Sequence, residues 1–177
     1  APTFAEYAAA LETAGCTIRR HFLRESEDFA VTEAFISAVD EDTDMVFLCQ
    51  PNNPTGQLTP LALVEALLRR CERCDALLVV DECFLDFLPE SEALSAKKLL
   101  ASPNLIILKA FTKLYGMAGV RLGYCWAATL PYWIRCSLPG SRGQFPALHR
   151  RRGWRRWTRP LCSPGARIDC RAASYFA

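Results

Sequence analysis

MVFLCQPNNPTG, residues 45–56, decides the fold of this chain. The segment from Met45 to Cys49 is an unbroken apolar run, which is typical of a strand that is buried on both faces. A turn rich in proline and asparagine follows at once, and these residues, with the closing glycine, suit the backbone angles of a rigid turn. The stretch therefore predicts a buried strand that ends in a fixed, amide-rich turn. A plain connector and a ligand-binding turn both fit this pattern.

Further apolar runs alternate with helix-like segments along the chain. We expect strands at 77–81 (LLVVD), 105–108 (LIIL) and 123–127 (GYCWA), and CTIRRHFL at 16–23 reads as a further short strand. Helical patterns occur at three places, the last of which has Thr59 as its expected N-cap: 5–14, 29–39 and 61–74. Apolar strands that alternate with helices predict an α/β domain, layered α/β/α around a mostly parallel sheet.

Polar residues follow three of these strands directly. Asn52 and Asn53 come after the first strand, Asp81 ends the second, and Lys113 lies just beyond the third. In open α/β sheets, ligands bind outside the carboxyl ends of the strands. The sequence therefore predicts a ligand site at this edge of the sheet.

These residue types suit the chemistry of an aldehyde cofactor with a pyridine ring. Lys113 has apolar neighbours, and a desolvated lysine is a nucleophile that forms a Schiff base with an aldehyde. Those neighbours are Phe111, Leu114 and Met117. A carboxylate such as Asp81 can keep a pyridine nitrogen protonated, which makes the ring an electron sink. The plainer alternatives are a solvated surface lysine and an aspartate that caps the next helix.

Two more residues complete this constellation. The amide of Asn53 can donate a hydrogen bond to a phenolic oxygen on such a ring. Arg121 follows Lys113 by eight residues and can clamp a phosphate with a charge-assisted fork.

The local words NNPTG, VVDECFLDF and LKAFTKLYGMAGVRLGY resemble those of the fold-type I pyridoxal-phosphate enzymes, the class I/II aminotransferase superfamily, over residues 2–130. The resemblance implies pyridoxal 5'-phosphate as cofactor, a layered α/β large domain and homodimers with sites at the subunit interface. It also implies a role for each matching position: Lys113 as the catalytic Schiff-base lysine, Asp81 at the pyridine nitrogen, Asn53 at the phenolic oxygen, and Thr112 and Arg121 at the phosphate.

The chain departs from the family pattern at two positions. Ala110 stands where Ser or Thr is common, and Phe84 stands where many members carry a tyrosine. Each change removes a hydroxyl that would contact the cofactor. Members of the family are also considerably longer, so the resemblance implies a truncated chain with weak or no activity.

Within this family, PTFAEY, DECFLDFLPE and KAFTKLYGMAGVRLGY are most similar to threonine-phosphate decarboxylases of cobalamin biosynthesis. Histidinol-phosphate aminotransferases share nearly every motif, so decarboxylation and transamination both stay open. The implied substrate is a small amino-acid phosphate or amino-alcohol phosphate.

Composition sets limits on the other classes of protein. No apolar run approaches the ~20 residues that span a membrane, and no signal peptide is evident, so we expect a cytoplasmic protein. Nine cysteines are scattered among helix and strand patterns, which favours reduced, packed thiols over a disulfide framework. Cys71 and Cys74 form a CxxC without a second pair, so a zinc module is the weakest alternative and no metal site is predicted.

Charge divides the chain into two parts. Residues 1–132, the predicted partial cofactor domain, hold 11 Lys and Arg against 18 Asp and Glu, whereas residues 133–177 hold 10 Arg and one acid. The segment RRRGWRRW mixes cations with stacking aromatics, as in arms that bind nucleic acid. We favour a second hypothesis, translation in a shifted frame. If the arginines of WRRWT use CGN codons, reading from the third base gives Ala, a small residue, then Leu, Met or Val, then Asp and a small residue, which would suit an amphipathic helix. We therefore expect an out-of-frame, disordered tail and no nucleic-acid partner.

Overall fold

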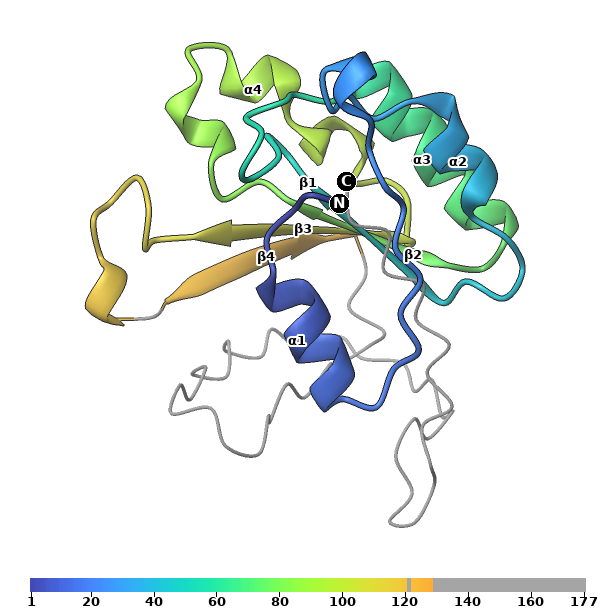
Figure 1. The fold of residues 1–177 in the computed structure, drawn as a ribbon. Helices are drawn as coiled ribbons and strands as arrows, with labels where there is room; N and C mark the ends of the chain where they lie inside the picture. The colour runs from blue at the N-terminus through green and yellow to red at the C-terminus, as the bar shows by residue number, and fades with distance from the viewer. Residues whose placement is uncertain (121, 129–177) are drawn as a thin grey trace.

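A computed structural model describes residues 1–120 and 122–128. Its centre is a four-stranded sheet in the order β1 (Met45–Cys49), β2 (Leu77–Asp81), β3 (Leu105–Ala110) and β4 (Gly123–Ala127). The first three strands run parallel and β4 is antiparallel to β3 (Figure 1). The predicted α/β class and mostly parallel sheet are confirmed.

Helices cover the sheet on both faces. Helices α2 (Glu33–Ala38) and α3 (Leu61–Arg73) lie on one face, and α1 (Glu6–Thr13) lies on the other (Figure 1). Short helical turns make up the connections: η1 (Glu25–Glu27), η2 (Leu85–Phe87), α4 (Ser91–Leu94), η3 (Ala96–Leu99) and η4 (Ala118–Val120). The molecule therefore has the layered arrangement that the alternating pattern predicts.

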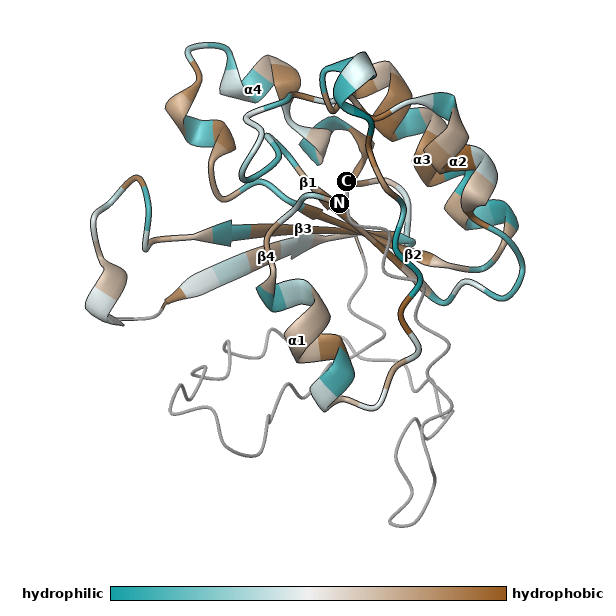
Figure 2. Cartoon of the chain, in the orientation of Figure 1, coloured by the Kyte–Doolittle hydropathy of each residue, from teal (hydrophilic) through white to brown (hydrophobic). Residues whose placement is uncertain are grey.

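Strands β1 and β2 are apolar on both faces because both faces are packed. Figure 2 shows brown, the hydrophobic end of its scale, in the middle of the sheet, whereas β4 is paler. In β1, Val46 and Leu48 join the main core with α2 and α3. Cys49 instead packs with α1 in a smaller cluster that contains Tyr7 and Leu11. Side chains alternate between the faces of a strand, so an all-apolar strand fits a sheet with cover on each side.

Three local predictions were wrong. Residues 16–23 form no strand; their backbone is held outside the sheet by bonds such as that from the Leu23 amide to the Ala1 carbonyl, at 3.0 Å. The helix predicted from residue 29 begins at Glu33, because Asp28 and Phe29 have positive φ angles of 52° and 54°, which no right-handed helix contains.

The third wrong prediction concerns Thr59, which is not the N-cap of α3. Pro60 occupies that position without a side-chain bond. Thr59 is buried, and the side chain of Gln50 binds both its amide and its carbonyl, at 2.9 and 2.6 Å. The threonine is thus used to close the turn after β1 and not to start the helix.

Some predictions fall on other parts of the chain. Arg121 and the basic segment 133–177 lie outside the described residues, and so does the predicted domain boundary at 132. No helix within the described part is long and apolar enough to cross a lipid bilayer.

Candidate active site

The three parallel strands bring the predicted site residues to one edge of the sheet. Cys49 and Asp81 are direct partners at the ends of β1 and β2, and the Gln50 amide donates to the Asp81 carbonyl at 2.8 Å. β3 ends at Ala110, three residues before Lys113. Asn53, Asp81 and Lys113 therefore all belong to segments at the carboxyl edge, where a ligand site is expected.

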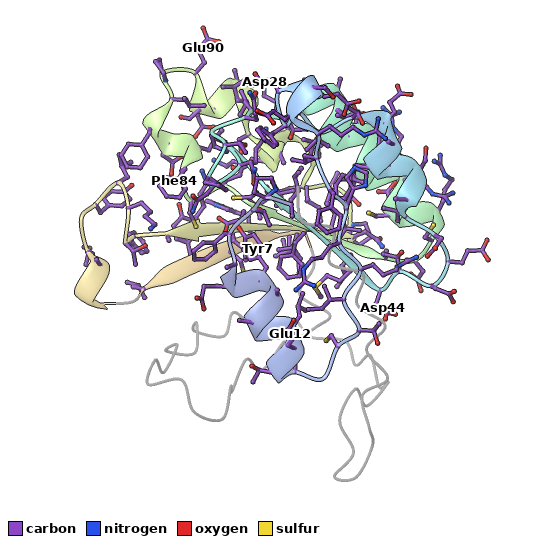
Figure 3. The ribbon with its side chains drawn as sticks, in the orientation of Figure 1. Tyr7, Glu12, Asp28, Asp44, Phe84 and Glu90 are labelled. Atoms are coloured by element: carbon purple, nitrogen blue, oxygen red, sulfur yellow. The ribbon has the colours of Figure 1, made fainter. Side chains whose placement is uncertain are left out.

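Asp81 is the most firmly held of these residues. The Tyr7 hydroxyl donates to Oδ2 of its carboxylate, and the Cys83 amide donates to Oδ1 at 3.0 Å. Figure 3 shows Tyr7 at the sheet end of α1. The Tyr7 ring stacks on Phe47, with centroids 5.4 Å apart and planes 27° from parallel. A half-buried carboxylate with two donors and a packed support is fixed in direction, as a charge that faces a ligand must be.

Tyr7 was not among the site residues predicted from the sequence. Burial raises the pKa of its hydroxyl, and the neighbouring Asp81 charge raises it further, so the hydroxyl keeps its proton and stays a donor. Tyr7 belongs to the PTFAEY word, whose likeness to the family was noted. The motif does not show which residue the Tyr7 side chain contacts, because helix α1 and strand β2 meet only in the folded chain.

The turn after β1 is held by Asn52 and not by Asn53. The Asn52 side chain donates to the Pro2 carbonyl and the Thr55 hydroxyl, at 3.0 and 2.9 Å, and accepts from the Thr3 hydroxyl at 2.8 Å. Asn52 is buried and Asn53 is only half-buried. One amide of the pair thus builds the turn, and the other stands nearer to solvent.

Lys113 is exposed, which corrects the predicted apolar enclosure. Leu114 and Met117 are 43% and 39% exposed, and Phe111 packs instead against Tyr115 and Tyr124, each at 5.3 Å between centroids. The apolar neighbours in sequence lie on a loop after β3, so they do not close over the lysine.

The Lys113 ammonium lies over an aromatic ring. Its Nζ lies 5.0 Å from the centroid of the Phe84 ring, within the range of a cation–π contact. Figure 3 labels Phe84 close to the carboxyl edge of the sheet. Phe84 follows Asp81 by three residues, so this contact connects the loop after β3 with the segment after β2.

The cysteines near this edge are free thiols. Burial raises the pKa of the Cys49 and Cys83 thiols above their ordinary value, so both keep their protons at neutral pH. Cys71 is buried in α3, and Cys74 follows it at the helix end. Within residues 1–120 and 122–128, no group of three or more potential metal ligands is placed to bind an ion.

Comparison with known proteins now gives the family. The sequence matches the family "aminotransferase class I and II" over residues 1–172. The chain belongs to the class I and II aminotransferases. This is a family of pyridoxal-phosphate-dependent enzymes, which fits the lysine and carboxylate at the sheet edge.

Curated relatives within this family include both predicted subfamilies. The chain is 42% identical over 123 residues to threonine-phosphate decarboxylase of Salmonella typhimurium, covering 70% of this chain and 34% of that protein. It is 35% identical over 135 residues to histidinol-phosphate aminotransferase of Methanococcoides burtonii, covering 76% and 34%. The chain thus spans about a third of the length of these aminotransferase relatives.

Solved aminotransferase structures share the fold. Histidinol-phosphate aminotransferase of Clostridium acetobutylicum aligns with a TM-score of 0.63 and 28% identity, over 72% of this chain and 38% of that one. A mutant of Thermus thermophilus aspartate aminotransferase aligns with a TM-score of 0.65 and 28% identity, over 72% and 33%.

Proposed function

We propose that this chain is part of the coenzyme-binding domain of a pyridoxal-phosphate enzyme that acts at Cα of a small phosphorylated amino acid. The observation that carries the proposal is the common edge of β1, β2 and β3, which holds Asn53, a doubly hydrogen-bonded Asp81 and Lys113. The donor set fits the coenzyme, because it offers a carboxylate for a pyridinium nitrogen and an amine for an aldehyde.

Lys113, Asp81 and Asn53 would each contact a different part of the coenzyme. Lys113 Nζ would hold the coenzyme through its aldehyde carbon and afterwards carry a proton to or from the reacting carbon. The carboxylate of Asp81, fixed by Tyr7 and the Cys83 amide, would keep a proton on the ring nitrogen. Asn53 would donate to the phenolic oxygen. When bound, pyridoxal phosphate supplies a ring that takes up the electron pair released at Cα.

The phosphate would be held by residues of the loop that follows β3. Thr112 is half-buried there and offers a hydroxyl. Arg121 would provide the fork of charged donors that suits a phosphate. Ala110 and Phe84 bring no hydroxyl, so we expect a coenzyme affinity below that of relatives with Ser and Tyr at these positions.

For the substrate, we propose threonine phosphate and loss of its carboxylate as CO₂, as in cobalamin biosynthesis. Support comes from the 42% identity to a threonine-phosphate decarboxylase, against 34–39% to histidinol-phosphate aminotransferases. Transamination of histidinol phosphate is the second candidate. We further propose a cytoplasmic enzyme that forms homodimers, and weak turnover at most for a chain that spans a third of its relatives.

The proposal is tested by chemical capture of the coenzyme. The protein is incubated with pyridoxal phosphate, reduced with borohydride and cleaved, and the labelled peptide is identified by mass spectrometry. We expect the label on Lys113 and its loss in Lys113→Ala. Lys98→Ala is the matched control, because Lys98 is exposed and binds only a local carbonyl in the described contacts, that of Ala93 at 3.0 Å. Labelling spread evenly over surface lysines would refute the coenzyme site.

The substrate is tested separately with the same protein. Threonine phosphate should release labelled CO₂ at a low rate that requires both pyridoxal phosphate and Lys113. Conversion of histidinol phosphate with a 2-oxo acid, without release of CO₂ from threonine phosphate, would favour the second candidate.

A further inference from the structure

A buried group of charges lies behind the proposed site, on the opposite face of the sheet ends. Glu82 follows Asp81 directly, and its side chain is 0% exposed. Its carboxylate accepts from the Ser95 hydroxyl at 2.8 Å and from the Ala96 amide at 2.7 Å. The ammonium of Lys109 lies 3.3 Å from Oε2 of the same carboxylate. Glu82 thus connects the end of β2 with the segment 95–96 and with β3.

Lys109 extends this group to a second carboxylate. Its Nζ donates to Asp86 Oδ1 at 2.7 Å, and its side chain is only 10% exposed. Burial lowers the pKa of the ammonium, but the hydrogen bond that it donates to Asp86 and the charge of Glu82 outweigh burial, so the pKa of Lys109 lies above its ordinary value. We call Glu82, Asp86 and Lys109 the buried brace.

The brace joins the two segments that carry the proposed reacting groups. Asp81 precedes Glu82, and Lys113 follows Lys109 by four residues. Backbone pairing already continues past β2 here, since the Glu82 amide donates to the Leu108 carbonyl at 3.0 Å. The brace adds a side-chain connection on the far face, so both segments are fixed from behind.

The buried brace does not form a ligand site, because the cavity beside it is too small and its charged groups are already paired with one another. The cavity beside Asp86, Lys109 and Trp126 has a volume of about 70 Å³, whereas pockets for organic ligands begin at roughly 300 Å³. The charges in the brace are paired with one another. Stability alone does not explain why these buried positions hold charged residues, because a well-packed apolar pair often stabilises a fold as well as a buried ion pair does.

We propose that Glu82, Asp86 and Lys109 are positioning residues, which set the spacing between Asp81 and the Lys113 loop. This inference rests on the proposed function. An ammonium shared by two carboxylates has few arrangements of similar energy, so it fixes a distance more strictly than apolar contact does. Coenzyme capture needs that distance, because the ring nitrogen and the aldehyde carbon of one rigid ring must meet Asp81 and Lys113 together.

The test replaces the brace by a neutral pair of similar size, Glu82→Gln with Lys109→Met. The glutamine keeps an acceptor for the Ala96 amide, and Asp86, which is 33% exposed, can be hydrated. We expect the thermal midpoint to change by less than about 3 °C. The pyridoxal-phosphate concentration for half-maximal labelling of Lys113 should rise at least about tenfold, and amides of residues 109–115 should exchange hydrogen faster.

The control is the exposed ion pair of α3, changed in the same way as Glu65→Gln with Arg69→Met. That pair is 3.0 Å apart with 44% and 61% of its side chains exposed, so labelling and exchange should not change. If the neutral brace does not fold, Asp86→Asn alone should still raise the half-maximal concentration about threefold.

The outcomes separate this inference from the proposed function. Unchanged labelling together with unchanged exchange in the neutral brace would overturn the positioning role. A wild-type chain that fails to label Lys113, while exchange in the variant still becomes faster, would overturn the coenzyme site and leave the brace in place.

Discussion

At the scale of single residues, the site depends on how one carboxylate is supported. Asp81 would lose its direction if it had only water as a donor, because a side chain at a strand end has rotational freedom. The Tyr7 hydroxyl and the Cys83 amide remove that freedom from two sides. Tyr7 is itself fixed by the Phe47 ring, so the support reaches from helix α1 through β1 to β2.

Replacement of Tyr7 by phenylalanine tests this support. A hydrogen bond to a charged group contributes about 1.5–3 kcal/mol, so we expect the free energy of unfolding to fall by about this much, while the ring can still stack on Phe47. Without this support for Asp81, capture of pyridoxal phosphate at Lys113 should need at least about ten times more coenzyme. Tyr115→Phe is the control, because Tyr115 is 58% exposed. Equal capture by the two variants would remove Tyr7 from the site.

Arg19 and Asp40 provide a pH-dependent contribution to stability. Both nitrogens of the Arg19 fork donate to the Asp40 carboxylate at 2.6 Å, and this bond holds the pKa of Asp40 well below its ordinary value of 3.8. A depressed folded pKa gives stability that is present above pH 3.8 and is lost as the pH falls below it.

Urea unfolding of Arg19→Gln beside the wild type checks the sign. The wild type should be more stable at pH 6, by at most about 1 kcal/mol because the pair is partly exposed, and the difference should shrink at pH 3. Part of it should persist, since Arg19 also donates to the Thr43 hydroxyl at 2.6 Å. A difference that grows towards acid pH would contradict the assignment.

At the scale of elements, strand β4 requires a glycine at its first position. Gly123 pairs with Ala110, and a Cβ at Gly123 would lie 2.8 Å from the Lys109 carbonyl oxygen, which is a backbone atom, so one of the two strands would have to shift. Gly119 in η4 has no atom within 4 Å of the same position. The two glycines therefore make a matched pair.

Alanine substitution at both positions measures how strongly β4 depends on this close approach. Gly123→Ala should cost about 1–3 kcal/mol, because β4 must shift away from β3, and Gly119→Ala should cost less than about 0.5 kcal/mol. Chemical unfolding of the two variants gives both values. Equal stabilities would mean that β4 is not paired as described.

The sequence predicted the strands of the sheet, but it also predicted a strand at 16–23 that does not form, and both results have a physical reason. The runs 45–49, 77–81 and 123–127 match β1, β2 and β4 to the residue. For β1 and β2 the reason is that strands buried on both faces have continuous apolar sequences, whereas β4 is a partly exposed edge strand. The run 16–23 mixes apolar and basic residues without a regular alternation, and whether such a segment pairs at a sheet edge depends on a partner that the sequence does not reveal.

The same limit applies to the candidate site. The parallel order of strands was enough to predict that Asn53, Asp81 and Lys113 belong to one edge. The contact between Tyr7 and Asp81 spans 74 positions, and the exposure of Lys113 depends on what packs over its loop. Both are properties of the assembled fold, and neither has a local pattern in the sequence.

At the scale of the whole chain, charge is strongly divided. Residues 1–132 have 11 basic and 18 acidic side chains, whereas residues 133–177 have 10 arginines and one acid. Arginines alone attract the phosphates of any nucleic acid, with an affinity that falls steeply with salt. Retention on DNA at low salt is therefore expected of this sequence whatever its role, and a more selective experiment is needed.

Substitution of Trp154 and Trp157 distinguishes a true nucleic-acid-binding arm from nonspecific attraction by the arginines. Aromatic stacking contributes about 1–3 kcal/mol per base in proteins that bind single strands, so a true arm would lose at least about tenfold in affinity on Trp154→Ala with Trp157→Ala. We expect no loss, because the out-of-frame hypothesis leaves only the arginine charge to act. Fluorescence anisotropy with a labelled oligothymidine at several salt concentrations gives both the affinity and its salt slope. Weaker binding with an unchanged slope would show that the tryptophans stack on bases, and the basic segment would then be a binding arm encoded in frame.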